Sequence, residues 1–242
     1  MAFGTIYTHN PNPRTTAILV LAKAQGLDLN VVYADRADGE GYDELLKINP
    51  LGQVPIFVAP DGWVLSECIP ITLYVASQSD TTTLLGSTRR DYYDIVRWMS
   101  FVNCDFMPAI GGCILPLIGR RVKIHKDTND CLRAMYEHCD LTNDHLTTNR
   151  YLVGDKLTVA DVFMTSLLFG LFKVFHPVVH EKYPSLTRWF YEVYDMPMFK
   201  GVVGEFEHVN LDYPKLSDDE SGTMANGKGL ETGKLNGKMA SA

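Results

Sequence analysis

The segments of this sequence that resemble β-strands lie in its first eighty residues, and beyond residue 88 the pattern is helical. Residues 13–25 carry apolar side chains at helical spacing, bracketed by Pro13, which suits the first turn of a helix, and Gly26, which suits its end. Apolar segments at residues 5–7 and 29–33 flank this helix and are predicted to be strands. A strand, a helix and a strand in succession indicate a parallel pair joined by a right-handed crossover.

A second group of elements completes this part of the chain. Residues 42–48 are predicted to form a short helix, and residues 69–78 a further one. Residues 55–59 and 63–65 are predicted to be strands, because the Pro-Asp-Gly run at residues 60–62 is a strong hairpin-turn signal. The order βαβ, then α, ββ and α, is that of a thioredoxin-like domain.

Four long amphipathic helices are predicted in the rest of the chain, at residues 89–119, 124–149, 159–175 and 185–203. The third begins with Thr158-Val159-Ala160-Asp161, which resembles a capping box with Asp in place of the usual Glu. In the first, Pro108, Pro116 and the glycine pair at residues 111 and 112 predict a broken helix, and such a break would open a pocket.

The sequence therefore predicts two domains, the first α/β and the second all-α. We expect a thioredoxin-like domain over residues 1–80 and an all-helical domain over residues 89–216, with the polar residues 81–88 as the linker. Residues 217–242 contain almost no large apolar side chain, so they cannot bury enough surface to offset the entropy lost on ordering. We expect a disordered tail there.

Charge and hydropathy exclude several functions. The chain of 242 residues has a net charge of -7, whereas a general nucleic-acid binder needs a basic face to replace phosphate counterions. No apolar run approaches the roughly 20 residues that cross a bilayer. The first five residues lack the basic and apolar regions of a signal peptide. We therefore expect a cytoplasmic protein that binds neither nucleic acid nor membrane.

The cysteines fit the same compartment. Their number is odd, no Cys-x-x-Cys pair occurs, and no Cys/His set has the spacing of a zinc finger. We expect free thiols that pack as small apolar side chains, and no metal site. The five are Cys68, Cys104, Cys113, Cys131 and Cys139.

The most specific motif is Asn-Pro-Leu-Gly-Gln-Val-Pro at residues 49–55, followed twelve residues later by Glu67-Cys68 at the start of a predicted helix. Together with residues 151–161 and 183–186, it resembles the glutathione transferase superfamily over residues 4–210. Within the superfamily, the sequence resembles the transferase-like domain of fungal elongation factor 1B gamma and stand-alone fungal transferases of secondary metabolism. The resemblance implies the glutathione transferase fold, a homodimer and glutathione as cosubstrate.

The resemblance also implies which residues bind glutathione. The family holds the bond corresponding to Val54–Pro55 in cis, which turns the backbone of Val54 outward, so that the cysteinyl unit pairs there like an added strand. Glu67 would take the γ-glutamyl ammonium, and the N–H groups that open the helix at Cys68 would take its carboxylate. Gln53 would reach the glycyl end.

Two positions depart from the family pattern. Cys68 stands where the family usually has Ser, and a thiol is a weaker donor than a hydroxyl, so binding would be weakened without being abolished. The family's cation for the glycyl carboxylate has no counterpart in residues 39–41, which are Gly-Glu-Gly. Lys47 and Arg14 are the candidates to replace it.

The residue that activates the thiol is expected in the loop at residues 9–15. Some classes use Tyr at the strand end, others use Ser or Cys in the loop, and the absence of Cys here argues against the classes that form mixed disulfides. Asn12 falls at the serine position, and Thr15 is a further donor. Tyr7 lies one residue from the tyrosine position, so its side chain would point to the other face of the sheet. An N-cap function is an alternative for Asn12 that does not exclude catalysis.

The electrophilic substrate is expected between that loop and the first long helix, where Asn103, Phe106, Met107 and Ile110 are the candidate pocket residues. Three functions stay open: a transferase that adds the activated thiol to an electrophile, a glutathione-dependent isomerase of a conjugated alkene, and a non-catalytic assembly module. Elongation factor gamma chains carry a further domain after a linker, whereas this sequence ends in a polar segment. We therefore favour an enzyme acting on a fungal secondary metabolite.

Overall fold

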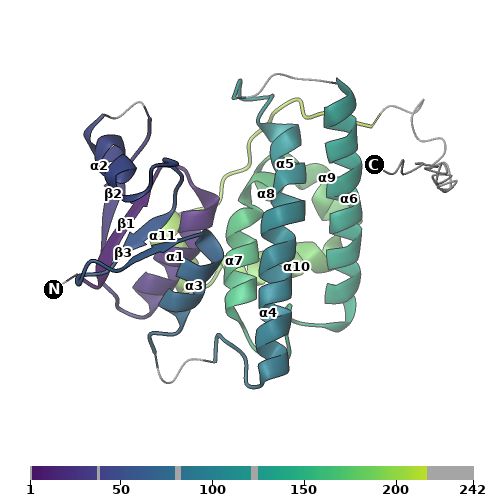
Figure 1. The fold of residues 1–242 in the computed structure, drawn as a ribbon. Coiled ribbons are helices and arrows are strands. Elements are labelled where there is room, and N and C mark those ends of the chain that lie inside the picture. The colour runs from purple at the N-terminus through teal and green to yellow at the C-terminus, as the bar shows by residue number, and fades with distance from the viewer. Residues whose placement is uncertain (1, 37–38, 80–82, 121–124, 217–242) are drawn as a thin grey trace, which may run out of the picture.

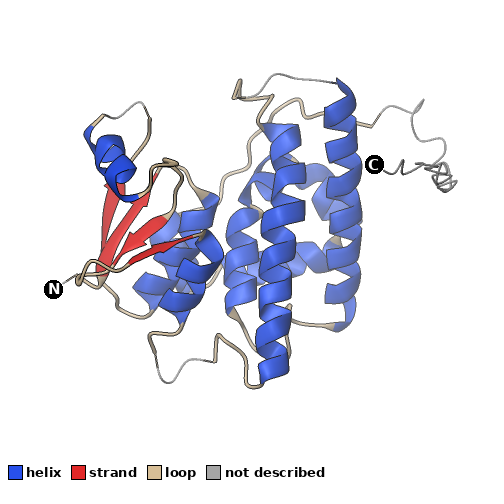
Figure 2. Cartoon of the chain, in the orientation of Figure 1, coloured by secondary structure: helices blue, strands red, loops and turns tan. Residues whose placement is uncertain are grey.

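The computed structural model describes residues 2–36, 39–79, 83–120 and 125–216, and it divides into a half with a β-sheet and a half made of helices (Figures 1 and 2). This confirms the predicted fold class, a thioredoxin-like α/β unit followed by an all-helical unit. The predicted disordered tail, residues 217–242, lies outside the described residues, and so does part of the predicted linker.

The first half has every element that the sequence predicts, with ends shifted by no more than two residues. The strands form one mixed sheet in the order β2-β1-β3-β4, in which β1 pairs parallel to β2 and antiparallel to β3, and β3 pairs antiparallel to β4. In chain order the elements are β1 (Gly4–Thr8), α1 (Pro13–Ala24), β2 (Leu29–Tyr33), α2 (Glu40–Ile48), β3 (Ile56–Val58), β4 (Val64–Ser66) and α3 (Cys68–Ala76).

The two faces of this sheet bury different clusters, because side chains alternate along each strand. Ile6 and Phe57 are fully buried in the main core, which α1 and α3 share. Tyr7 and Ile56 belong to a second apolar cluster with Leu45 of α2. The neighbouring residues Ile6 and Tyr7 therefore lie on opposite faces of the sheet, with Tyr7 on the face that α2 covers.

The helical half is more divided than the sequence predicts. The predicted helices at residues 159–175 and 185–203 are each two shorter helices, split before Phe169 and before Pro197. The predicted helix at residues 89–119 contains a π-helical turn, and one further helix was not predicted. The elements are α4 (Arg89–Phe101), η1 (Val102–Phe106), α5 (Met107–Ile114), α6 (His125–Thr148), α7 (Val159–Leu167), α8 (Phe169–Val174), α9 (His176–Lys182, the unpredicted one), α10 (Pro184–Tyr194) and α11 (Pro197–Val203).

The predicted break at the glycine pair is wrong. Gly111 and Gly112 lie inside α5, and a Cβ added to Gly112 would lie 2.2 Å from the Sγ of Cys131 on α6, so this glycine allows close helix packing. The irregularity lies earlier, in the π-helical turn η1. Pro108 lacks the N–H that a regular helix would direct four residues back, which interrupts the α-helical pattern just before it.

The predicted capping box at the start of α7 is present. The carboxylate of Asp161 accepts hydrogen bonds from the backbone N–H and the hydroxyl of Thr158, at 2.9 and 2.8 Å. It also accepts one from the backbone N–H of Leu152 (2.9 Å) and one from the indole of Trp189 (2.8 Å). Burial raises the pKa of this carboxyl, against the opposing effect of these donors. Asp161 therefore joins α7, α10 and the preceding loop at a fully buried point.

The chain returns to the first half before it ends. Helix α11 packs against α1 (Figure 1), where the Nζ of Lys23 donates to the carbonyl of Gly201. The following residues cross back over the helical half, with Phe206 against Phe169 and Tyr213 against Phe175. Within the described residues, no helix is both long enough and apolar enough to span a membrane.

Candidate functional site

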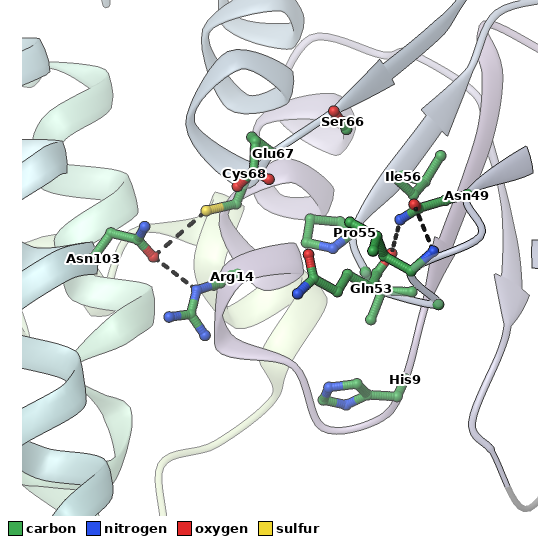
Figure 3. A pocket seen from close by; sticks show the side chains of 13 residues that line it. His9, Arg14, Asn49, Gln53, Pro55, Ile56, Ser66, Glu67, Cys68 and Asn103 are labelled. Carbon is green, nitrogen blue, oxygen red and sulfur yellow. Dashed lines mark hydrogen bonds between the residues drawn. The ribbon is translucent and has the colours of Figure 1, made fainter.

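A polar cavity of about 470 Å³ lies where the first half faces η1 (Figure 3). The five residues predicted to bind glutathione all line it: Gln53, Val54, Pro55, Glu67 and Cys68. The segments before α1, before β3 and at the start of α3 supply most of the lining, and the helical half supplies one residue, Asn103. The cavity is therefore built mainly by the thioredoxin-like half.

Asn49 fixes the loop before β3. Its side-chain Nδ2 donates to the carbonyl of Gln53 (3.0 Å), and its Oδ1 accepts from the backbone N–H of Leu51 (3.2 Å). Gly52 has a φ of 61°, and a Cβ there would lie 2.4 Å from the hydroxyl of Tyr42, so another residue would be strained and would displace this side chain. The peptide bond before Pro55 is cis. The loop holds its shape through its own hydrogen bonds, before any ligand binds.

Glu67 stands at the N-cap of α3 with a backbone conformation that non-glycine residues seldom adopt. Its φ is 69°, and among the described residues it is the only non-glycine with a positive φ. Such a conformation costs on the order of 1–3 kcal/mol and is frequent at functional sites. The side chain is exposed at the cavity and makes no capping hydrogen bond. Its carboxylate therefore stands beside the N–H groups that open α3, with both available to a ligand.

Asn103 connects the helical half to the cavity. Its Oδ1 accepts a hydrogen bond from the Nε of Arg14 at 2.7 Å and a weaker one from the Sγ of Cys68 at 3.6 Å (Figure 3). Burial raises the pKa of Cys68, and the nearby charge of Arg14 opposes this to a smaller extent. Cys68 is thus a protonated thiol at neutral pH. Asn103 lies on η1, and π-helical turns occur often at functional sites.

The predicted thiol activators do not line the cavity. Asn12 is 9% exposed; its Oδ1 accepts from the backbone N–H of Arg14 (3.1 Å), and its Nδ2 donates to the hydroxyl of Thr8 (3.3 Å). The hydroxyls of Thr8 and Thr15 are 2.7 Å apart. These three polar side chains form a buried cluster beneath the loop. Tyr7 packs on the α2 face of the sheet, where burial, and then Glu44, raise its pKa.

Of the four residues predicted to form the electrophile pocket, one lines the cavity and the other three pack in or against the core. Asn103 lines the cavity, whereas Phe106 and Ile110 are buried in the main core and are not part of its lining. Met107 is half-buried against the same core. Phe106 and Ile110 follow the helical spacing that a packed face requires, which explains why sequence alone did not separate them from pocket residues.

Seven cavity residues were missed or given another place by sequence reasoning. Three of them, Leu51, Gly52 and Ile56, belong to or adjoin the predicted motif at residues 49–55. His9, Asn49 and Ser66 line the cavity without having been predicted to do so, although Asn49 and Ser66 adjoin predicted site residues. Arg14 was considered for the glycyl end, yet it lies beside Cys68. Lys47 is exposed and is not part of the lining.

The cavity, with its proline loop on one side and the start of α3 on the other, and the helical half behind it define a protein of the glutathione transferase class. Family models agree. The N-terminal domain model of glutathione S-transferases matches residues 2–77, and the C-terminal domain model matches residues 106–197. The chain belongs to the glutathione S-transferase family.

Individual relatives support this assignment. Glutathione S-transferase mdpJ of Emericella nidulans is 44% identical over 212 residues, which cover 88% of this chain and 96% of that protein. Glutathione S-transferase psoE of Aspergillus fumigatus is 34% identical over 222 residues, 90% of each chain. The crystal structure of the GST-like domain of elongation factor 1-gamma from Saccharomyces cerevisiae superposes with a TM-score of 0.74 at 30% identity, covering 89% of this chain and all of that one.

Proposed function

We propose that the protein binds glutathione in this cavity and activates its thiol for addition to an electrophilic small molecule. The observation that carries the proposal is a pair of opposite charges in one cavity. Glu67 and Arg14 both line it, and among the described residues neither makes a salt bridge. The γ-glutamyl end of glutathione carries an ammonium and a carboxylate close together, which matches such a pair.

The remaining contacts follow the direction of an extended peptide. The γ-glutamyl ammonium pairs with Glu67, and its carboxylate meets the N–H groups that open α3. The cysteinyl unit pairs with the backbone of Val54. Gln53, with Asn49 beside it, takes the glycyl end. Lys47 is not part of the cavity lining, so in this proposal neutral donors hold the glycyl carboxylate.

The thiol is stabilised from the start of α1. Lowering a thiol pKa by two units requires about 2.7 kcal/mol. One hydrogen bond to the thiolate contributes about 1.5–3 kcal/mol, and a helix N-terminus about 0.3–1 kcal/mol. Asn12 at the N-cap of α1 lies beneath the loop and not in the cavity lining, but it is our candidate for the donor. Among the described residues, one N–H of its amide binds Thr8 and the second has no partner, so the second could donate to the thiolate. Thr15 supports this arrangement through Thr8.

The two alternatives differ in what supports them. A break at the glycine pair would have opened a pocket for a large conjugated substrate of an isomerase, but α5 is continuous there. Isomerisation is therefore supported only by the thiolate chemistry that it shares with transfer. The assembly-module interpretation is supported by the similarity to the elongation factor domain. That the electrophile is a fungal secondary metabolite is part of our proposal for the enzyme.

Binding and turnover separate these functions. We expect isothermal calorimetry to detect glutathione, and S-methylglutathione to bind without supporting turnover. A transferase consumes glutathione in proportion to product formed from a conjugated enone, whereas an isomerase changes the alkene geometry and leaves glutathione undiminished. Binding without either reaction across a panel of electrophiles would favour the assembly module. Absence of binding would refute the proposal.

We also propose a homodimer, with the first half of one copy against the helices of the other. Exposed Trp63 and Val64 on the sheet side and Tyr92 and Tyr93 on α4 give apolar surface for such a contact. Sedimentation at micromolar concentration should give about twice the mass of one chain. A mass near that of one chain would contradict the dimer.

A further inference from the structure

Arg14 is held through the Nε of its guanidinium. Its Nε donates to Asn103, and among the described residues its terminal nitrogens donate no hydrogen bond and meet no carboxylate within 4 Å. The side chain is half-buried and lines the cavity. A guanidinium has five N–H donors, and a partly buried charge is costly unless it is paired. The terminal N–H groups of Arg14 are therefore free, among the described residues, to bind an anionic group in the cavity.

The partner that holds Arg14 is neutral. An aspartate at position 103 could accept the same hydrogen bond, but its charge would neutralise the guanidinium within the protein. The amide of Asn103 fixes Arg14 and leaves its charge free. Because Asn103 also meets the Sγ of Cys68, the guanidinium is held at the end of the cavity where α3 begins (Figure 3).

We propose that Asn103 is a positioning residue that holds Arg14 for the γ-glutamyl carboxylate of glutathione, a role that rests on the proposed function. Arg14 replaces the donor that is weakened where Cys68 stands instead of serine. It does not serve the glycyl carboxylate, for which the sequence offered Arg14 and Lys47 as candidates. The helical half thereby takes part in recognising a group bound by the other half, through a single amide.

The Asn103→Asp variant tests the charge separately from the contact. The aspartate should pair with Arg14, so the melting temperature should be unchanged or higher, while calorimetry should show glutathione binding about tenfold weaker. Its affinity should also depend less on ionic strength than that of the wild type. Asn10→Asp is the matched control, because it adds the same charge on an exposed neighbouring loop outside the cavity lining. If Asn103 had only a structural role, the melting temperature and the glutathione affinity of Asn103→Asp should fall together.

Two glutathione analogues identify the carboxylate. γ-Glutamylcysteine lacks the glycyl unit, and 4-aminobutyryl-cysteinyl-glycine lacks the γ-glutamyl carboxylate but keeps the ammonium. The loss of affinity caused by Asn103→Asp should persist with the first analogue and disappear with the second. The opposite pattern would assign Arg14 to the glycyl end and overturn the proposal, as would wild-type affinity in Asn103→Asp. A wild-type protein that does not bind glutathione would remove the proposed function itself.

Discussion

The backbone N–H of Arg14 donates to the side-chain oxygen of Asn12, 3.1 Å away, so the residue predicted to activate the thiol also caps α1. The side-chain amide of Asn12 is buried below the cavity, whereas the guanidinium of Arg14, two residues later, lies in the cavity lining. The cap uses the oxygen of the Asn12 side chain, whereas the catalytic role that we propose would use its N–H, so the two functions would depend on different atoms. This difference can be tested.

Asn12→Asp should separate the two functions of this residue. An aspartate keeps the capping oxygen at a helix N-terminus, so the free energy of unfolding should be preserved, whereas Asn12→Ala should lose about 1 kcal/mol. Both variants remove the N–H donor, so both should raise the pKa of bound glutathione and slow turnover by about 10²-fold. The pKa can be read from the thiolate absorbance during a pH titration. Normal turnover in Asn12→Asp, with loss of turnover in Tyr7→Phe, would assign the activator to Tyr7.

Glu67 should show opposite effects on binding and stability. Glu67→Ala leaves the γ-glutamyl ammonium unpaired, and we expect binding at least about tenfold weaker by calorimetry. Glu67→Gly should bind equally poorly, yet it should melt at a higher temperature than Glu67→Ala, because glycine adopts a φ of 69° without strain. Unchanged affinity in both variants would remove Glu67 from the site.

Asp161 and Asp91 form a matched pair, because each completes a capping box but only Asp161 is buried. Asp161→Ala leaves the indole of Trp189 and the N–H of Leu152 without an acceptor in the core, so the free energy of unfolding should fall by at least about 2 kcal/mol. Asp91→Ala frees backbone N–H groups that water can reach, so its loss should be clearly smaller. Equal losses in urea denaturation would mean that burial does not set the cost.

The sequence predicts the elements best where local signals decide them. Helix α1 begins at Pro13 and ends before Gly26, and both signals are read within the helix itself. The role of Gly112 was misread, because glycine is needed there for close packing against Cys131 on another helix, and no local pattern reveals such a contact. The site divides in the same way. The motif at residues 49–55 is contiguous, whereas Arg14 on α1 and Asn103 on η1 lie 89 residues apart and meet only in the folded chain.

Acidification should destabilise the fold through a histidine cluster formed by α9 and the segment after α11. His176 and His180 on α9 meet His208 from the segment after α11, with the rings of His176 and His208 stacked at 4.1 Å. Burial, and then the neighbouring imidazoles, lower the pKa of both His176 and His180. The two residues are therefore neutral in the folded protein at a pH where the unfolded chain already binds protons.

The direction of the pH effect follows from this difference in proton binding. An unfolded histidine has a pKa of about 6.5, so stability should be lost as the pH falls below about 6.5 toward the lower folded values. His176→Phe keeps a ring stacked on His208 but cannot bind a proton, so its melting temperature should fall less between about pH 7.5 and about pH 5.5 than that of the wild type. Glu181→Gln changes an exposed charge on the same helix and should retain the wild-type pH dependence. If His176→Phe loses as much stability on acidification as the wild type, the effect originates elsewhere, with half-buried His138, whose pKa burial also lowers, as the next residue to test.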